Sequence, residues 1–161
     1  MTVTNVHKNP DDCTMTITAE FDAPIEHVWE LWKDPRKLER WWGPPTYPAT
    51  MVDFDLSPGG TVNYYMTGPN GEHAGGWWRI FAVDAPHSLD FEDGFSDEKG
   101  VPNPTMPSTI SRVTLSEKPT GGTRMTISSK WASLVHMNQM IAMGMEEGMT
   151  AAMGQIDGLL A

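Results

Sequence analysis

The sequence has 161 residues, of which 39% are hydrophobic and 20% charged, a composition that suits a packed domain of ordinary size. Its formal net charge is −10, so we expect no nucleic-acid partner and no anionic membrane partner, since both require a basic surface. The single cysteine, Cys13, excludes an intrachain disulfide. No signal peptide and no stretch of roughly 18 apolar residues is present, so the cytoplasm is the expected compartment.

The first expected elements are a strand and two short helices. Apolar and polar side chains alternate over Thr14–Asp22, which is typical of a half-buried strand. Pro24 suits a first helical position, and the helical spacing of the apolar residues after it predicts a helix over Ile25–Trp32. Asp34-Pro35 ends this helix and opens a second one, Arg36–Trp42, before a Gly-Pro-Pro sequence.

The middle of the chain predicts a run of strands joined by turns. Short turns favour antiparallel pairing, and Gly68-Pro69-Asn70-Gly71 is the strongest hairpin turn. The polar stretch from Asp93 to Pro107 is rich in Gly and Pro and is predicted to be a mobile loop. The expected strands are Met51–Leu56, Thr61–Thr67, Ala74–Val83, Leu89–Glu92, Thr109–Ser116 and Thr123–Lys130.

The remainder of the chain, Ser133–Leu160, contains no proline and predicts one long helix. Ser133 is the expected N-cap, and a bend is expected near Gly144 or Gly148. A run of strands followed by a helix indicates an α+β domain whose helix covers one face of the sheet. With no repeat and no second domain visible, residues 1–161 are expected to form one domain.

Several motifs occur in order along nearly the whole chain. They are Phe21-Asp22-Ala23-Pro24, Trp41-Trp42-Gly43-Pro44, Asp55-Leu56-Ser57-Pro58-Gly59-Gly60, Gly68-Pro69-Asn70-Gly71 and Gly144-Met145-Glu146-Glu147-Gly148. Together they resemble the family related to the C-terminal domain of the activator of heat-shock protein 90 ATPase, within the START-like superfamily (SRPBCC, Bet v 1-like). The resemblance implies a helix-grip fold, in which a curved antiparallel sheet of about six to seven strands wraps around a long C-terminal helix. A hydrophobic cavity often lies between the two.

Small residues recur every four positions along the expected C-terminal helix, at Gly144, Gly148 and Ala152. Each interior glycine costs roughly 1 kcal/mol relative to alanine, so something must offset that cost. Close packing against a bulky sheet residue such as Trp78 is the favoured explanation for the glycines alone. Room left for a ligand is the alternative, and both stay open at this point.

Aromatic strand residues and the methionine-rich helix are expected to face each other across the cavity. Six methionines within residues 137–153 surround more than half of the helix, so some of them must face loops, a partner or solvent. Trp77 and Trp78 are adjacent on a strand and must point to opposite faces, and Trp78 is expected to face inward. The predicted ligand-binding residues are Trp41, Trp42, Tyr64, Met66, Trp78, Phe91, Met137, Ile141, Gly144, Met145, Gly148 and Met149.

Neither a catalytic motif nor a metal-ligand motif is present, so no catalytic residue, metal or cofactor is predicted. The five histidines lack zinc-site spacing. The strand carboxylates, including Asp90, Glu92 and Asp93, are interpreted as solvated, although a buried carboxylate would suit an acid–base step. One of Glu146 and Glu147 is expected to point to solvent, and the other could reach Arg112 or Arg124.

Three functions remain as hypotheses. The leading one is non-enzymatic binding of a small hydrophobic or aromatic molecule in the cavity. The resemblance also implies a protein-interaction module of heat-shock protein 90 co-chaperone type, with a chaperone as partner. The third is a cyclase- or hydrolase-like enzyme, which requires an acid–base group directed into the cavity. Exposed tryptophan would also suit a homodimer.

Overall fold

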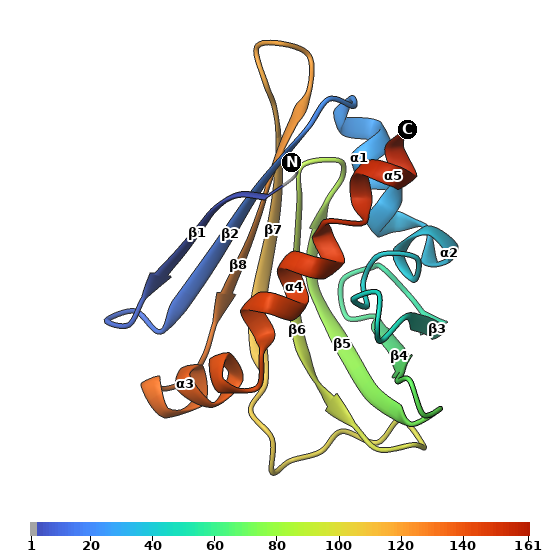
Figure 1. The fold of residues 1–161 in the computed structure, drawn as a ribbon, viewed down its shortest axis with the longest axis vertical. Coiled ribbons are helices and arrows are strands. Elements are labelled where there is room, and N and C mark those ends of the chain that lie inside the picture. The colour runs from blue at the N-terminus through green and yellow to red at the C-terminus, as the bar shows by residue number, and fades with distance from the viewer. Residues whose placement is uncertain (1–2) are drawn as a thin grey trace.

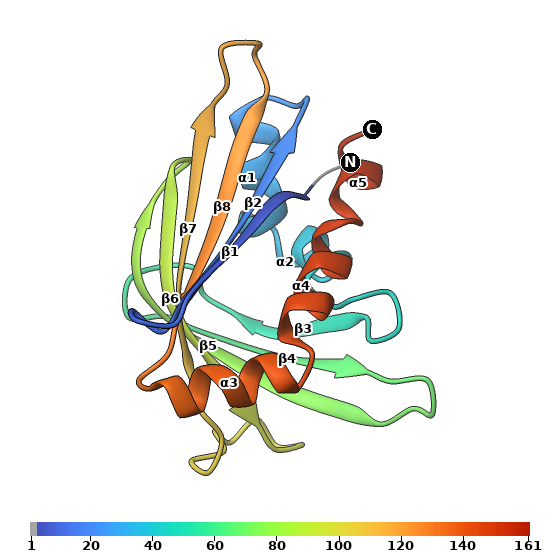
Figure 2. The same ribbon diagram turned by 60° about the vertical axis from the view of Figure 1, so that its left-hand side comes forward.

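Eight antiparallel strands dominate the computed structural model, which describes residues 3–161 (Figure 1). They form one sheet in the order β1-β2-β8-β7-β6-β5-β4-β3. Figure 2 shows that this sheet is curved and that the C-terminal helices lie on its concave side. The strands are β1 (Val3–Asn9), β2 (Thr14–Phe21), β3 (Ala49–Phe54), β4 (Thr61–Thr67), β5 (His73–Asp84), β6 (Ser88–Ser96), β7 (Thr109–Glu117) and β8 (Thr123–Lys130).

This architecture confirms the α+β helix-grip prediction, with one strand more than expected. The additional strand is β1, which pairs antiparallel with β2 through a register that includes Val6 opposite Ile17. Residues 1–2, which the one-domain prediction included, lie outside the described residues. Over residues 3–161 no helix has the length and apolar character needed to cross a bilayer.

Two short helices, α1 (Ile25–Lys33) and α2 (Pro35–Leu38), connect β2 to β3. Asp34 ends the first helix and caps the second, because its side chain accepts a hydrogen bond from the backbone N–H of Arg36. The apolar face of α1 is fully buried at Val28 and Trp32. This burial holds the segment after α2 against the concave face of the sheet.

The C-terminal helical segment is divided into α3 (Leu134–Ala142), α4 (Met145–Met153) and α5 (Ile156–Leu160). The expected bend near Gly144 is a full interruption, because Gly144 has a φ of 90° and precedes α4 as its N-cap. A left-handed backbone of this kind favours glycine, which has no Cβ to clash. The predicted N-cap is confirmed, since the Ser133 side chain accepts a hydrogen bond from the N–H of His136.

A cluster of aromatic rings fills the core between α1, α2 and the sheet. Trp78 and Phe91 stack with ring centroids 4.2 Å apart, and Trp42 meets Trp78 edge-on at 4.9 Å. Trp32 contacts Trp41 at 4.8 Å. Such ring pairs stabilise the core by about 0.5–1.5 kcal/mol each beyond their burial. Trp78 therefore faces inward, as predicted.

Three local predictions are wrong. The second short helix, predicted over Arg36–Trp42, ends at Leu38. The stretch predicted as a loop from Asp93 begins as strand, since β6 continues to Ser96 and pairs with β5 along that length. Glu146 forms an ion pair with Lys8 of β1 rather than with Arg112 or Arg124. Those arginines pair with carboxylates on their neighbouring strands instead, because direct cross-strand neighbours lie closer than the helix does.

Candidate functional site

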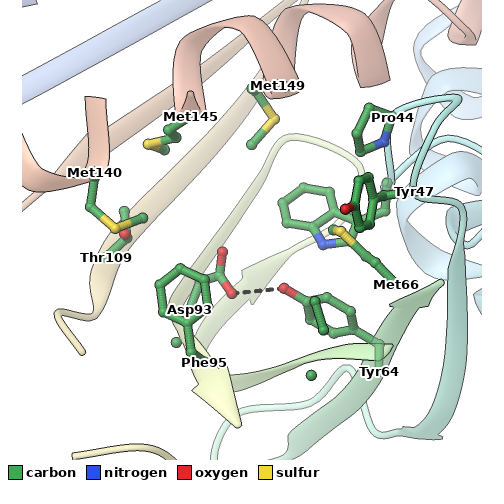
Figure 3. A pocket seen from close by; sticks show the side chains of 15 residues that line it. Pro44, Tyr47, Tyr64, Met66, Asp93, Phe95, Thr109, Met140, Met145 and Met149 are labelled. Atoms are coloured by element: carbon green, nitrogen blue, oxygen red, sulfur yellow. Dashed lines mark hydrogen bonds between the residues drawn. The ribbon is translucent and has the colours of Figure 1, made fainter. Parts of the chain in front are cut away.

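A cavity of about 260 Å³ lies between the concave face of the sheet and the C-terminal helices (Figure 3). Its volume is just below the roughly 300–1,000 Å³ that is usual for small-molecule sites, so it suits a small occupant. The walls are mainly aromatic rings and methionines. The lining residues are Trp42, Pro44, Tyr47, Tyr64, Met66, Ala74, Gly75, Asp93, Gly94, Phe95, Thr109, Met140, Met145, Gly148 and Met149.

The methionine wall comes from the helices. Met145, Gly148 and Met149 are three and four residues apart in α4, so they share one helix face. Met140 of α3 extends the same wall, which Figure 3 shows opposite Tyr64 and Asp93. A Cβ built on Gly148 would meet nothing within 4 Å. The missing side chain at this position therefore leaves open space in the wall.

The sheet wall carries a polar pair formed by two inward-facing strand residues. The Tyr64 hydroxyl of β4 donates a hydrogen bond to Asp93 Oδ1 of β6 over 3.1 Å. The Tyr64 ring reaches across β5 at Gly76, where a Cβ would lie only 2.3 Å from the ring atom Cζ. Glycine at this position is thus what allows Tyr64 and Asp93 to meet.

The pair lies in an environment that disfavours charge. Burial raises the pKa of Asp93 to about 7, although the Tyr64 hydrogen bond acts in the opposite direction. The pKa of Tyr64 is raised well above its usual range, first by burial and then by the nearby charge of Asp93. Asp93 keeps some accessible surface because it borders the cavity. It can therefore meet an occupant in either protonation state near neutral pH.

Two indole N–H groups lie close to the same phenol. Within residues 3–161, Nε1 of Trp42 and Nε1 of Trp78 are buried without a hydrogen-bond partner. Their rings contact the Tyr64 ring at centroid distances of 6.4 and 6.3 Å. Both indoles act to lower the pKa of Tyr64, because their N–H dipoles favour negative charge on its oxygen. The Tyr64 oxygen thus faces donors while its hydrogen is directed to Asp93.

No positive side chain offsets the Asp93 carboxylate inside the cavity. The described lining contains no lysine, arginine or histidine. Over residues 3–161, no group of three His, Cys, Asp or Glu side chains lies close enough together to hold a metal ion. An ionised Asp93 therefore depends on Tyr64 and on whatever occupies the cavity.

Six of the twelve residues predicted as ligand-binding lie in the cavity wall. They are Trp42, Tyr64, Met66, Met145, Gly148 and Met149. Strand alternation indicated Tyr64 and Met66, and helical spacing indicated Met145, Gly148 and Met149, whereas Trp42 was expected from its place at the end of the second short helix. Their role in binding stays a prediction.

The other six lie outside the wall. Trp41 is turned into the core, where its Nε1 donates to the Leu31 carbonyl over 3.0 Å. Trp78 and Phe91 stack on each other in the buried ring cluster. The remaining three, Met137, Ile141 and Gly144, belong to α3 or to the break after it and do not border the cavity.

The two glycines of the small-residue ridge have different explanations. Close packing against Trp78, favoured from the sequence, is wrong for both, since a Cβ added to either glycine would have no atom of the Trp78 ring within 4 Å. Gly144 supplies the left-handed backbone that separates α3 from α4. Gly148 borders the cavity. Ala152, the third member, is buried.

Asp93 is the most important residue that the sequence analysis missed as a site residue. Its signal was present, because Leu89, Phe91, Asp93 and Phe95 continue one alternating series beyond the predicted end of the strand. The missed lining residues from turns and neighbouring strands carry no such pattern. The full set of missed lining residues is Pro44, Tyr47, Ala74, Gly75, Asp93, Gly94, Phe95, Thr109 and Met140.

The fold and the motifs agree with a comparison against protein families, in which Activator of Hsp90 ATPase homolog 1-like protein matches residues 22–161. The chain belongs to this family. Family and fold together support a ligand-binding or co-chaperone-like fold, and they specify neither a ligand nor a function. A search of curated proteins gives no match.

Solved structures of similar proteins share the fold over nearly the whole chain. Protein Ms6760 from Mycobacterium smegmatis is 50% identical with a TM-score of 0.91, over 99% of this chain and 97% of that one. A protein from Arthrobacter aurescens is 48% identical with a TM-score of 0.94, over 99% and 92%. A Staphylococcus epidermidis protein is 27% identical with a TM-score of 0.84, over 98% and 93%.

Proposed function

We propose that this protein binds a small, mostly apolar or aromatic molecule in the cavity between the sheet and the C-terminal helices. The observation that carries the proposal is the cavity of about 260 Å³ with its largely apolar wall and one convergent polar pair. This combination is typical of small-molecule sites, where apolar surface supplies affinity and a few polar groups fix orientation.

The composition of the wall suits ligand binding better than it suits simple core packing. Met140, Met145 and Met149 can change rotamer around a guest, because methionine is unbranched and its thioether is polarisable. The rings of Trp42 and Phe95 offer flat apolar faces. Gly148 keeps the space between these groups open. We expect the cytoplasm to be the compartment in which binding occurs.

The test compares a variant in which a leucine side chain fills part of the cavity with a variant that carries the same substitution on the protein surface. Gly148→Leu places a side chain in the open space, whereas Gly158→Leu adds the same atoms on the exposed face of α5. Binding of small aromatic compounds is measured by isothermal titration calorimetry. We expect Gly148→Leu to lose at least about tenfold in affinity, because the added side chain takes up the space of the guest, and Gly158→Leu to bind as the wild type does.

Two outcomes would reject the binding proposal. One is that no member of a panel of small apolar and aromatic compounds binds the wild-type protein. The other is that Gly148→Leu, while folded, binds as tightly as Gly158→Leu. Circular dichroism of each variant separates loss of binding from loss of fold.

Acid–base catalysis is the second candidate function, and Asp93 is the observation that favours it. An enzyme of this fold requires an acid–base group directed into the cavity, and Asp93 occupies that position with a pKa raised to about 7 by burial. Proton abstraction next to a carbonyl can be followed by NMR as deuterium exchange into phenylacetone. Exchange by the wild type that Asp93→Asn abolishes would support this function, and exchange at the uncatalysed rate would refute it.

The co-chaperone hypothesis is supported by family membership. The corresponding measurement is the ATPase rate of purified heat-shock protein 90 with and without this protein. An unchanged rate together with the absence of complex formation would reject the hypothesis. Light scattering after size exclusion tests the homodimer that we also propose.

A further inference from the structure

Asp93 presents a carboxylate oxygen to the cavity without a protein donor. Its Oδ1 accepts from Tyr64, and within residues 3–161 its Oδ2 has no hydrogen-bond partner. Figure 3 shows this carboxyl group on the wall that faces Met145 and Met149. A buried carboxylate is stable only when it is paired with a positive charge and hydrogen-bonded. The wall provides neither a positive charge nor a donor to Oδ2, so the occupant is expected to supply them.

None of the three hydroxyl groups of the described wall donates to this second oxygen. Thr109, the cross-strand neighbour of Asp93, accepts a hydrogen bond from Trp131 Nε1 over 2.9 Å and makes none to Asp93. Tyr64 donates its hydrogen to Asp93, and the Tyr47 hydroxyl donates to Glu72 Oε1 over 3.1 Å. Both phenols therefore have their hydrogens committed to carboxylates. When Asp93 is ionised, the polar part of the cavity is rich in acceptors. The polar part of the cavity is therefore complementary to a ligand that carries hydrogen-bond donors.

The aromatic wall favours a positive charge on that ligand. Trp42, Tyr47, Tyr64 and Phe95 all border the cavity. The negative faces of aromatic rings attract organic cations, and this attraction is stronger when the ammonium group is held away from water. An aromatic enclosure that also contains a carboxylate is complementary to an ammonium ion carried on an apolar body.

We propose that the cavity binds a small apolar amine in its protonated form, with Asp93 Oδ2 accepting a hydrogen bond from the ammonium group and the aromatic and methionine wall surrounding the hydrocarbon part. This inference rests on the proposed binding function and names the chemical class of its ligand.

The ionisation of Asp93 makes the proposal measurable. Because its pKa is raised to about 7, the free protein holds both protonation states of Asp93 near neutral pH. Amine binding stabilises the carboxylate and therefore releases protons in this pH range. The groups facing Asp93 from neighbouring elements are Tyr64 of β4 and the uncharged residues Met140, Met145 and Met149, so no other wall group titrates in this range.

The negative net charge of the protein also favours a cationic ligand. The net charge of −10 attracts cations to the surface, and Glu72 places a carboxylate next to Tyr47 at the edge of the cavity. An anionic ligand meets repulsion at both places. The cavity is thus expected to select ligands by the sign of their charge as well as by their shape.

The experiment compares three ligands that have nearly the same shape. Phenethylamine, phenylethanol and phenylpropanoate are titrated into the wild-type protein at pH 8 by calorimetry. We expect the amine to bind about tenfold or more tightly than the alcohol, because a charge-assisted hydrogen bond is about twice as strong as a neutral one. The carboxylate is expected to bind most weakly. Titrations at pH 7 in two buffers with different ionisation enthalpies measure the released proton.

Matched variants locate the effect. Asp93→Asn is expected to remove the preference for the amine and the proton release. Asp90→Asn is the control, since Asp90 is on the same strand but pairs with the exposed Arg112 on the opposite face. Tyr64→Phe removes the hydrogen bond that lowers the pKa of Asp93, so the midpoint of amine affinity is expected to move to higher pH. This shift can be measured even if Asp93→Asn does not fold.

The outcomes separate the inference from the proposed function. If phenylethanol binds as tightly as the amine, or if no proton is released, the amine inference fails while small-molecule binding stands. Preference for the carboxylate also overturns it. If neither these ligands nor the wider panel bind, both proposals fall.

Discussion

At the scale of single residues, the most informative position is Asp93. The carboxyl occupies an inward strand position that apolar residues fill at Leu89 and Phe91. Burying a carboxyl there costs stability, and its pKa of about 7 reflects that cost. Asp93 has one oxygen directed into a cavity despite this cost in stability. These are the properties of a residue that recognises a polar ligand group or transfers a proton.

Asp93 should make stability depend on pH. Because its folded pKa is raised above the unfolded value near 3.8, the protonated form stabilises the fold at low pH, and this contribution is lost as pH rises from about 4 through about 7. We expect Asp93→Asn not to show this loss. Its free energy of unfolding at pH 8 should therefore exceed that of the wild type by a few kcal/mol. Urea unfolding at pH 5 and pH 8 measures the difference.

The control for this measurement is Asp90→Asn, whose carboxylate is paired with Arg112. It should not gain stability between pH 5 and pH 8 relative to the wild type. A constant difference between Asp93→Asn and the wild type at the two pH values would show that Asp93 is ionised as easily in the fold as in water.

At the scale of secondary structure, the break between α3 and α4 decides how the helices meet the sheet. Met140 lies on one side of the break and Met145 on the other, and both border the cavity. A continuous helix would carry these residues along a single axis. The turn at Gly144 lets two helices of different direction contribute to one wall, as Figure 2 shows.

Glycine-to-alanine changes on the two sides of this turn should have opposite effects. Gly144→Ala places a Cβ on a backbone with a φ of 90° and is expected to cost about 1–2 kcal/mol of unfolding free energy. Gly148→Ala lies inside α4 with open space around it and should gain up to about 1 kcal/mol. Chemical denaturation measures the unfolding free energy of both variants. If the two substitutions change it in the same direction, this explanation of the helix break is wrong.

At the scale of the whole molecule, the cavity is enclosed by parts of the chain that are far apart in sequence. The sheet wall comes from β4, β5, β6 and the start of β7, while the facing wall comes from α3 and α4. Lys8 of β1 pairs with Glu146 of α4, which adds a further link between the sheet and the helices. A ligand that contacts both walls is therefore expected to stabilise the fold as a unit.

This coupling predicts a thermal shift. At a phenethylamine concentration of 100 times its Kd, binding to the folded state adds about 2.7 kcal/mol. For a chain of this length such a gain raises Tm by roughly 5–10 °C. Differential scanning calorimetry should show the rise for the wild type and for Gly158→Leu but not for Gly148→Leu. A rise that persists in Gly148→Leu would place the ligand outside the cavity.

The sequence by itself determined the class of the fold and most of its elements. Alternation located the strands from Thr14 onward, and proline and serine marked helix starts at Pro24 and Ser133. These signals are local, because side-chain periodicity and capping depend on neighbouring residues. The same local reasoning placed Tyr64 and Met149 on inward faces, and these residues do line the cavity.

Only the tertiary structure decided which inward residues enclose space and which fill the core. Trp78 and Phe91 share the inward face with Tyr64 and Asp93, yet they are stacked in the ring cluster while the polar pair borders the cavity. That division depends on sheet curvature and on the angle between α3 and α4. Both arise from contacts between distant segments, and periodicity along the chain does not record them.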